Sequence, residues 1–212
     1  GENPIRIQSM ANVSTMDTEA AVAQAIRMIE AGAEYVRFTA QGEREARNLG
    51  EIRKQLNEQG YTTPLVADIH FNPRAADAAA GEVEKVRINP GNYVDKVKTF
   101  SHLEYTDEEY AAEIEKIRER FVPFLNICKA HGTAIRIGVN HGSLSDRIMS
   151  RYGDTPHGMV ESCMEFLRIC RDEDFPNVVI SIKASNPVVM VKTVRLLVKT
   201  MEAEGMSYPL HL

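Results

Sequence analysis

The stretch PLVADIHFNPRAADAAAGEVEKVRINP, from Pro64 to Pro90, decides the fold class of this chain. Two short runs of β-forming residues, Pro64–His70 and Lys85–Pro90, flank an alanine-rich segment. Asn72 precedes Pro73, the arrangement of a helix cap followed by proline in the first helical turn. A strand, a helix and a second strand in this order predict parallel strands joined by a crossover helix.

The same alternation extends in both directions along the chain. Further strands are expected at Ile5–Ser9, Tyr35–Ala40, Ala134–Asn140 and Val178–Ser185, with a stub at Pro209–Leu212. Helices are expected between these strands. Their start signals are the cap Asp17 and the pairs Thr155-Pro156 and Asn186-Pro187, and their stop signals are Gly32 and Gly60. Leu49, Ile52 and Leu56 form the apolar stripe of one of them. Pro123 should end or kink the helix that contains it.

Two architectures fit this order: an open doubly wound sheet and a (β/α)8 barrel. No glycine-rich phosphate turn follows the first strand, which disfavours the dinucleotide-binding form of the open sheet. Six complete strand–helix units and a seventh strand favour the barrel, which takes about 250 residues when complete. We therefore predict an α/β fold, a TIM-type (β/α)8 barrel truncated within strand seven.

Composition and charge exclude several classes of protein. The chain has 212 residues, of which 43% are hydrophobic and 26% charged, so it can bury a core and is neither disordered nor fibrous. No apolar run reaches the roughly 18–20 residues of a membrane helix, and the net charge of −5 does not favour nucleic acid as a partner. Cys128, Cys163 and Cys170 form no CxxC pair, which disfavours a disulfide scaffold and indicates a reducing, cytoplasmic setting.

Charged residues inside the expected strands are the informative feature. Parallel strands are covered on both faces and normally read as apolar runs. Here they carry polar sets on one face, because residues i and i+2 share a face: Arg37 with Thr39, Asp68 with His70, Arg87 with Asn89, Arg136 with Asn140, and Lys183 with Ser185. In a closed barrel these sets would point inward near the carboxyl ends of the strands, where barrel enzymes hold their active sites.

The balance of these charges predicts an anionic ligand. Four cations and one carboxylate leave a positive surplus, which is costly to bury unless a bound anion neutralises it. Arginine suits two-pronged binding of phosphate oxygens. The alternative is that these residues are solvent-facing positions of an antiparallel edge, or partners in internal ion pairs.

Two further hypotheses stay open at this point. Asp68, His70, His141 and His211 are donors for a metal-dependent barrel hydrolase or lyase, although their spacing matches no firm metal signature and hydrogen-bonded pocket lining is the simpler interpretation. The chain would otherwise be a non-catalytic scaffold whose open barrel edge pairs with another chain.

Seven strings occur in order along nearly the whole chain: PIRIQSM, YVRFTA, PLVADIHF, KVRINPGN, AIRIGVNHGSLSDRI, ISIKASNP and PLHL. Together they resemble the N-terminal barrel of the 4-hydroxy-3-methylbut-2-enyl-diphosphate synthase family, which acts in non-mevalonate isoprenoid biosynthesis. The additional segment Asn92–Tyr105 resembles the long form of this family. The resemblance implies that residues 1–212 are an incomplete substrate-binding barrel of a cytoplasmic enzyme, or of a plastid enzyme if the source is a plant.

The resemblance also implies a substrate, a cofactor and partners. The substrate would be 2-C-methyl-D-erythritol 2,4-cyclodiphosphate, whose ring opens with loss of a C–O bond. A [4Fe-4S] cluster would be held by a separate C-terminal domain, with ligands outside this chain, and reduced ferredoxin or flavodoxin would be the electron donor; a homodimer stays open. Arg37, Arg87, Arg136 and Lys183 would grip the diphosphate, and Asp68, His70, Asn89, Asn140, Ser185 and His211 would line the pocket.

Overall fold

The computed structural model describes residues 4–94 and 104–212. The chain forms two compact units: one holds Gly1–Ile88 and Ile127–Ile135, and the other holds Asn89–Asn126 and Arg136–Leu212. Most of the expected long-form segment, Asn92–Tyr105, lies outside the described residues. Within the described part of the chain, no helix has the length and apolar character needed to cross a lipid bilayer.

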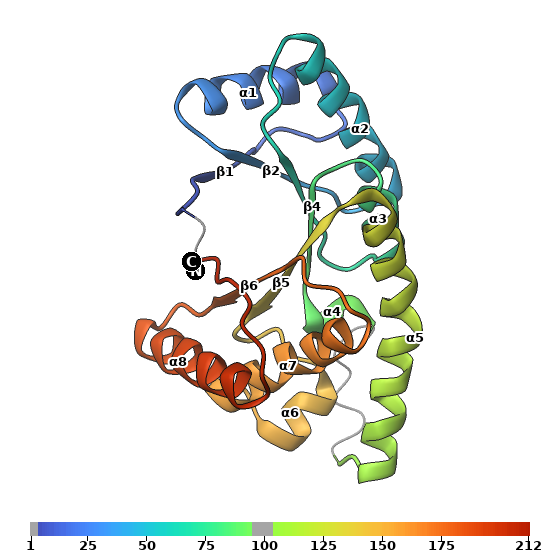
Figure 1. The fold of residues 1–212 in the computed structure, drawn as a ribbon, viewed down its shortest axis with the longest axis vertical. Coiled ribbons are helices and arrows are strands. Elements are labelled where there is room, and N and C mark those ends of the chain that lie inside the picture. The colour runs from blue at the N-terminus through green and yellow to red at the C-terminus, as the bar shows by residue number, and fades with distance from the viewer. Residues whose placement is uncertain (1–3, 95–103) are drawn as a thin grey trace. The chain divides into compact units, whose positions relative to one another are not determined.

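The first unit contains four parallel strands with a helix after each of the first three. Strands β1 (Gln8–Met10), β2 (Tyr35–Thr39), β3 (Leu65–Asp68) and β4 (Lys85–Ile88) alternate with helices α1 (Thr18–Glu30), α2 (Glu43–Glu58) and α3 (Pro73–Ala80). Strand β2 pairs with β1 and β3, and β3 pairs with β4, all in parallel. Figure 1 shows the three helices on one side of these strands. This arrangement confirms the predicted strand–helix alternation.

The strands and helices of the first unit enclose an apolar core. Val36 and Phe38 of β2 are fully buried, and so are all four residues of β3. On α2 the predicted stripe of Leu49, Ile52 and Leu56 is buried as well. Gly60 follows this helix with a positive φ of 86°, a conformation that favours glycine and ends the helix where the sequence indicated.

The second unit is rich in helices. It holds α4 (Pro90–Tyr93), most of α5 (Asp107–His131) and of β5 (Ala134–Asn140), and then α6 (Asp146–Tyr152), α7 (Pro156–Asp172), β6 (Val178–Lys183) and α8 (Pro187–Ala203). Helices α7 and α8 pack against each other (Figure 1). Leu210 forms an isolated parallel bridge with Ile180 of β6, which is the expected start of a further strand.

Four aromatic rings form the centre of the second unit. Tyr93 of α4, Phe121 and Phe124 of α5, and Phe166 of α7 are all buried. The ring centroids of Phe121 and Phe166 lie 5.0 Å apart in an edge-to-face arrangement, and Tyr93 lies about 6 Å from the other three. Such pairs are favourable beyond the area they bury. This cluster therefore fixes α4, α5 and α7 to one another.

The helix caps that the sequence predicted are present. A side-chain oxygen of Asp17, Asn72, Thr155 or Asn186 accepts a hydrogen bond from a backbone N–H in the first turn of the helix that follows it, at 2.9–3.1 Å. Each cap satisfies a donor that the helix itself leaves unpaired. Asp17, Asn72 and Asn186 lie in the loops after β1, β3 and β6, so these three caps set where the helix that follows each strand begins.

Several expected boundaries are wrong. The strands expected to end at His70, Pro90 and Ser185 end at Asp68, Ile88 and Lys183. The first strand begins at Gln8 and not at Ile5, because Ile5 and Ile7 are 97% and 62% exposed and bury little apolar surface. The Ile7 carbonyl still accepts hydrogen bonds from the N–H groups of Glu34 and Tyr35. Helix α5 does not end at Pro123 but continues to His131. Proline removes one helical hydrogen bond, and burial of the neighbouring phenylalanines outweighs that loss.

Candidate anion-binding site

Three neighbouring strands of the first unit carry polar side chains at the same level. Asp68, the last residue of β3, lies opposite Thr39 of β2 and Arg87 of β4 in the register of the sheet. Arg37 precedes Thr39 by two residues and therefore shares its face. His70 follows Asp68 by the same spacing. The i, i+2 pattern that the sequence showed thus becomes one group of side chains at the carboxyl ends of β2, β3 and β4.

Arg37, Asp68, His70 and Arg87 are in direct contact, and we call them the Asp68 cluster. Arg37 Nη2 lies 2.8 Å from Asp68 Oδ2, and Arg87 Nη1 donates to Asp68 Oδ1 at 3.2 Å. His70 Nε2 lies 3.3 Å from Asp68 Oδ2, while its Nδ1 lies 3.4 Å from Arg87 Nη1. The structure therefore brings together four of the ten predicted site residues around a single carboxylate.

The ionisation of the Asp68 cluster follows from its surroundings. Burial alone would raise the pKa of the Asp68 carboxyl, but the hydrogen bond from His70 and the charges of Arg87 and Arg37 outweigh burial and hold this pKa well below its usual range. Burial lowers the pKa of Arg87, and the Asp68 charge opposes that effect. An arginine stays protonated in proteins, so both guanidinium groups and the carboxylate are charged at neutral pH.

The Asp68 cluster carries a positive net charge of its own. Its two guanidinium groups and one carboxylate sum to one positive charge, counting only the side chains of the cluster. The alternative that the strand cations are partners in internal ion pairs is therefore right only in part. Asp68 forms ion pairs with both Arg37 and Arg87, but its single negative charge equals the charge of only one of them. The side chains of His70 and Arg37 are 37% and 12% exposed, whereas those of Arg87 and Asp68 are buried. An anion would reach the cluster on the side of His70 and Arg37.

Asn89 has a structural role that the sequence did not indicate. It is buried, and its Oδ1 accepts a hydrogen bond from the N–H of Gly91 at 3.1 Å, which caps the short helix α4. Gly91 in turn lies against the loop after β5: a Cβ at this position would overlap the carbonyl oxygen of Ser143 and come within 3.2 Å of Leu144 Cα. Asn89 and Gly91 therefore hold the chain after β4 close to the loop after β5.

Replacing Gly91 by alanine is expected to lower the free energy of unfolding by about 2 kcal/mol, because the added methyl group must displace backbone and not a flexible side chain. Urea unfolding of the 212-residue chain measures this change. Gly42→Ala is the matched control, since a Cβ there would meet only Glu45 Oε2 at 3.8 Å. Equal midpoints for the two variants would contradict the close approach at Gly91.

In the second unit, Arg136 is buried. It is 1% exposed, and its Nη1 donates to the hydroxyl of Ser181 at 2.8 Å. Ser181 was missed by sequence reasoning, although it stands two residues before Lys183 and the i, i+2 rule would have found it. The Oδ1 atom of Asn140, also on β5, is buried with no hydrogen-bond partner among the described residues. A bound ligand or water would satisfy it.

The other predicted residues of the second unit are more open to solvent. Lys183 and Ser185 are exposed, and His211 is partly exposed. The backbone carbonyl of Lys183 accepts a hydrogen bond from His141 N–H at 2.8 Å, and His211 N–H donates to the carbonyl of Ile180 at 2.7 Å. These contacts fix the backbone on either side of β6. The roles of the three side chains stay predictions.

A buried charged group in the second unit was not predicted. The Tyr110 hydroxyl donates to Glu165, and Arg147 forms an ion pair with the same carboxylate. Burial raises the pKa of Glu165, and the charge of Arg147 opposes it. Burial and the Glu165 charge also raise the pKa of Tyr110. The three residues come from α7, α5 and α6, so this group ties those helices together.

The donors of the metal hypothesis do not gather in either unit. Asp68 contacts His70 in the first unit, while in the second His141 Nε2 lies 3.6 Å from Asp154 Oδ1. Across residues 4–94 and 104–212, no group of three or more histidine, cysteine or acidic side chains is placed to share an ion. Nothing in the geometry of the described residues favours a metal-dependent hydrolase or lyase.

The three cysteines do not fit the ligands of an iron–sulfur cluster. Cys128 of α5 and Cys163 and Cys170 of α7 are fully buried. Burial raises the pKa of Cys128 to about 12 and raises that of Cys163 as well. Cluster ligands are thiolates, whereas burial keeps the thiols of Cys128 and Cys163 protonated at neutral pH, and Cys170 is equally buried. Their role is packing.

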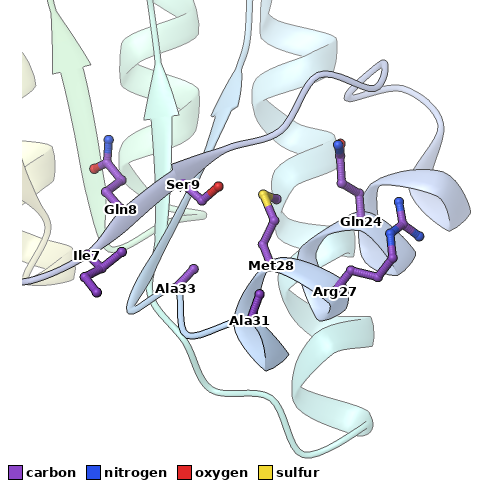
Figure 2. A pocket seen from close by; sticks show the side chains of 8 residues that line it. All are labelled: Ile7, Gln8, Ser9, Gln24, Arg27, Met28, Ala31 and Ala33. Carbon is purple, nitrogen blue, oxygen red and sulfur yellow. The ribbon is translucent and has the colours of Figure 1, made fainter.

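A hollow of 380 Å³ lies between β1 and α1 of the first unit (Figure 2). It is lined by Ile7, Gln8, Ser9, Gln24, Arg27, Met28, Ala31 and Ala33. None of these is a predicted site residue, and Arg27 is the one charged side chain among them. The hollow therefore offers no group of reactive side chains, and the candidate chemistry stays with the Asp68 cluster.

Comparison with known families decides what kind of barrel this is. A model of the GcpE TIM-barrel domain matches residues 1–212. The chain belongs to the GcpE TIM-barrel family. This match confirms both the predicted fold class and the family resemblance, and the alternation of strands and helices described above agrees with it.

Two relatives of this GcpE barrel carry the same name. A protein of Parabacteroides distasonis named 4-hydroxy-3-methylbut-2-en-1-yl diphosphate synthase (flavodoxin) is 95% identical over 212 residues, which are 100% of this chain and 35% of that protein. A protein of Porphyromonas gingivalis with the same name is 60% identical over 213 residues, 100% of this chain and 36% of that protein. The chain thus spans about a third of the length of these curated relatives.

Solved structures support the fold of the GcpE barrel alone. The 3-keto-D-glucoside 4-epimerase of E. coli matches with a TM-score of 0.54 at 11% identity, covering 98% of this chain and 90% of that chain. A truncated 3-deoxy-D-arabino-heptulosonate 7-phosphate synthase of Thermotoga maritima matches with a TM-score of 0.53 at 10% identity, covering 92% and 60%. One fold hosts many reactions, so these matches carry no function.

Proposed function

We propose that the chain is the substrate-binding barrel of a reductive dehydroxylase. The enzyme would convert 2-C-methyl-D-erythritol 2,4-cyclodiphosphate to 4-hydroxy-3-methylbut-2-enyl diphosphate in non-mevalonate isoprenoid biosynthesis. The names of the relatives support this product, and the family match over residues 1–212 supports the assignment of the barrel. Two electrons and two protons balance the reaction, with one oxygen of the substrate leaving as water.

The observation that carries the proposal is the positive surplus of the Asp68 cluster. A diphosphate bears at least two negative charges, and two guanidinium groups at the carboxyl ends of parallel strands suit it in charge and in geometry. The proposal assigns the grip on the diphosphate to the predicted cations Arg37, Arg87, Arg136 and Lys183. Asp68, His70, Asn89, Asn140, Ser185 and His211 would line or shape the pocket.

The electron-transfer parts of the proposed enzyme lie outside these residues. The family resemblance implies a [4Fe-4S] cluster, and the buried thiols of this chain do not fit as its ligands. The relatives' name supports flavodoxin as the donor, and ferredoxin is the alternative within the family. A cytoplasmic location and a homodimer belong to the same proposal. This chain by itself is therefore expected to bind substrate weakly at best and not to turn it over.

Replacing Arg136 by alanine in the full-length protein is expected to lower kcat/KM for the cyclodiphosphate roughly a hundredfold, since a buried charge-assisted contact to the ligand is lost. Arg136→Lys should lose roughly tenfold, because it keeps the charge but not the two-pronged geometry. Steady-state assays with reduced flavodoxin measure both.

The matched control is Arg53→Ala. Arg53 is 41% exposed and pairs with Glu84, so its removal should leave kcat/KM within about twofold. Unchanged activity in Arg136→Ala, with the protein folded, would refute the role of the strand cations. It would favour the scaffold hypothesis if the chain also failed to bind the cyclodiphosphate.

A further inference from the structure

Asp68 is enclosed by the groups it contacts. Its side chain is 0% exposed, Arg87 Nη1 lies on Oδ1, and Arg37 Nη2 and His70 Nε2 both lie on Oδ2. A ligand that approached the exposed side of the cluster would meet His70 and Arg37 and not the carboxylate. This matters because a carboxylate in contact with a diphosphate would repel it. Asp68 is compatible with an anion site because three other side chains stand between it and solvent.

The same contacts determine which nitrogen of His70 carries the proton. Nε2 lies 3.3 Å from an ionised carboxylate oxygen, so the negative charge of Asp68 favours a proton on Nε2. Nδ1 faces Arg87 Nη1, which only donates, so Nδ1 must present its lone pair. A second proton on Nδ1 would point at a guanidinium N–H. The arrangement therefore favours the Nε2–H tautomer, whose Nδ1 lone pair orients Arg87.

We propose that Asp68 is a positioning residue: it fixes His70 as the Nε2–H tautomer and aligns Arg37 and Arg87, without touching the ligand. The chain of contacts runs from Asp68 Oδ2 to His70, from His70 Nδ1 to Arg87, and from Arg87 back to Asp68 Oδ1. Such a closed ring restricts three side chains at once, so little rotamer freedom is lost when an anion binds. The identity of that anion rests on the proposed function.

Nitrogen NMR of ¹⁵N-histidine-labelled full-length protein tests the tautomer without ligand. The His70 signals, assigned by their loss in His70→Gln, should show a protonated Nε2 and an unprotonated Nδ1. In Asp68→Asn the pattern should move toward a mixture of the two tautomers. Glu84→Gln is the control, because Glu84 also binds an arginine, Arg53, and caps the start of β3 through Leu65 N–H; it should leave the His70 signals unchanged.

Kinetics supply the second readout. Asp68→Asn should raise KM for the cyclodiphosphate about tenfold, the loss of one well-placed contact to a charged group, while kcat changes less than twofold. Glu84→Gln should change neither. A protonated Nδ1 in the wild-type protein, a measurement that needs no folded variant, would overturn the proposal, as would unchanged His70 signals or an unchanged KM in Asp68→Asn. Failure of the wild-type protein to bind cyclodiphosphate would refute the proposed function and leave the tautomer result standing.

Discussion

Replacing Arg87 by methionine is expected to lower the free energy of unfolding by about 3 kcal/mol, because it leaves a buried carboxylate with one of its two guanidinium partners. Methionine fills a similar volume, so the loss of charge and not a cavity dominates the effect. The change appears in urea unfolding of the 212-residue chain as a lower midpoint. Hydrogen exchange should locate the loss of protection in strands β3 and β4.

Arg53→Met provides the matched comparison for this prediction. Arg53 also pairs with a carboxylate next to β4, that of Glu84, but both side chains are more than 40% exposed. Exposed ion pairs contribute at most about 1 kcal/mol, so this variant should unfold close to the wild-type midpoint. An equally small change in the unfolding midpoint of Arg87→Met would contradict the claim that Arg87 stabilises the buried Asp68 carboxylate.

Replacing Phe166 by alanine is expected to lower the free energy of unfolding by about 4 kcal/mol, since Phe166 is fully buried against Tyr93 and Phe121 and the space cannot close without moving three helices. Urea unfolding measures the total loss. Hydrogen exchange should show it in α4, α5 and α7, whose contacts the ring joins.

The control for this variant removes the same side chain from an exposed position. Phe71 is 76% exposed, so Phe71→Ala should change the free energy of unfolding by no more than about 0.5 kcal/mol. Its ring lies 5.9 Å from that of His70, so the same variant also shows whether ligand binding depends on this edge of the Asp68 cluster. A loss below about 1 kcal/mol in Phe166→Ala would mean that the aromatic cluster is not a packed core.

Short-range sequence patterns predicted much of the fold. The helix caps at Asn72, Thr155 and Asn186 depend on residues a few positions apart, so they were readable without tertiary structure. The strand faces were readable for the same reason, because side chains alternate along a strand. This alternation alone singled out Arg37, Asp68, His70 and Arg87 as members of one polar face.

Tertiary structure decided what those residues do to one another. Register between β2, β3 and β4 places both arginines on the two oxygens of Asp68, and no spacing along the chain encodes that sharing. Helix α5 continues past Pro123 because tertiary packing outweighs the local preference of proline to end a helix. The hydrogen bond from Arg136 to Ser181 is likewise a contact between residues far apart in the sequence. The alternation of strands and helices and the identity of the polar face were set by short-range sequence. The charge balance and the tautomer at Asp68 arise only where separate strands meet, because electrostatic contacts and burial depend on distance in space and not along the chain.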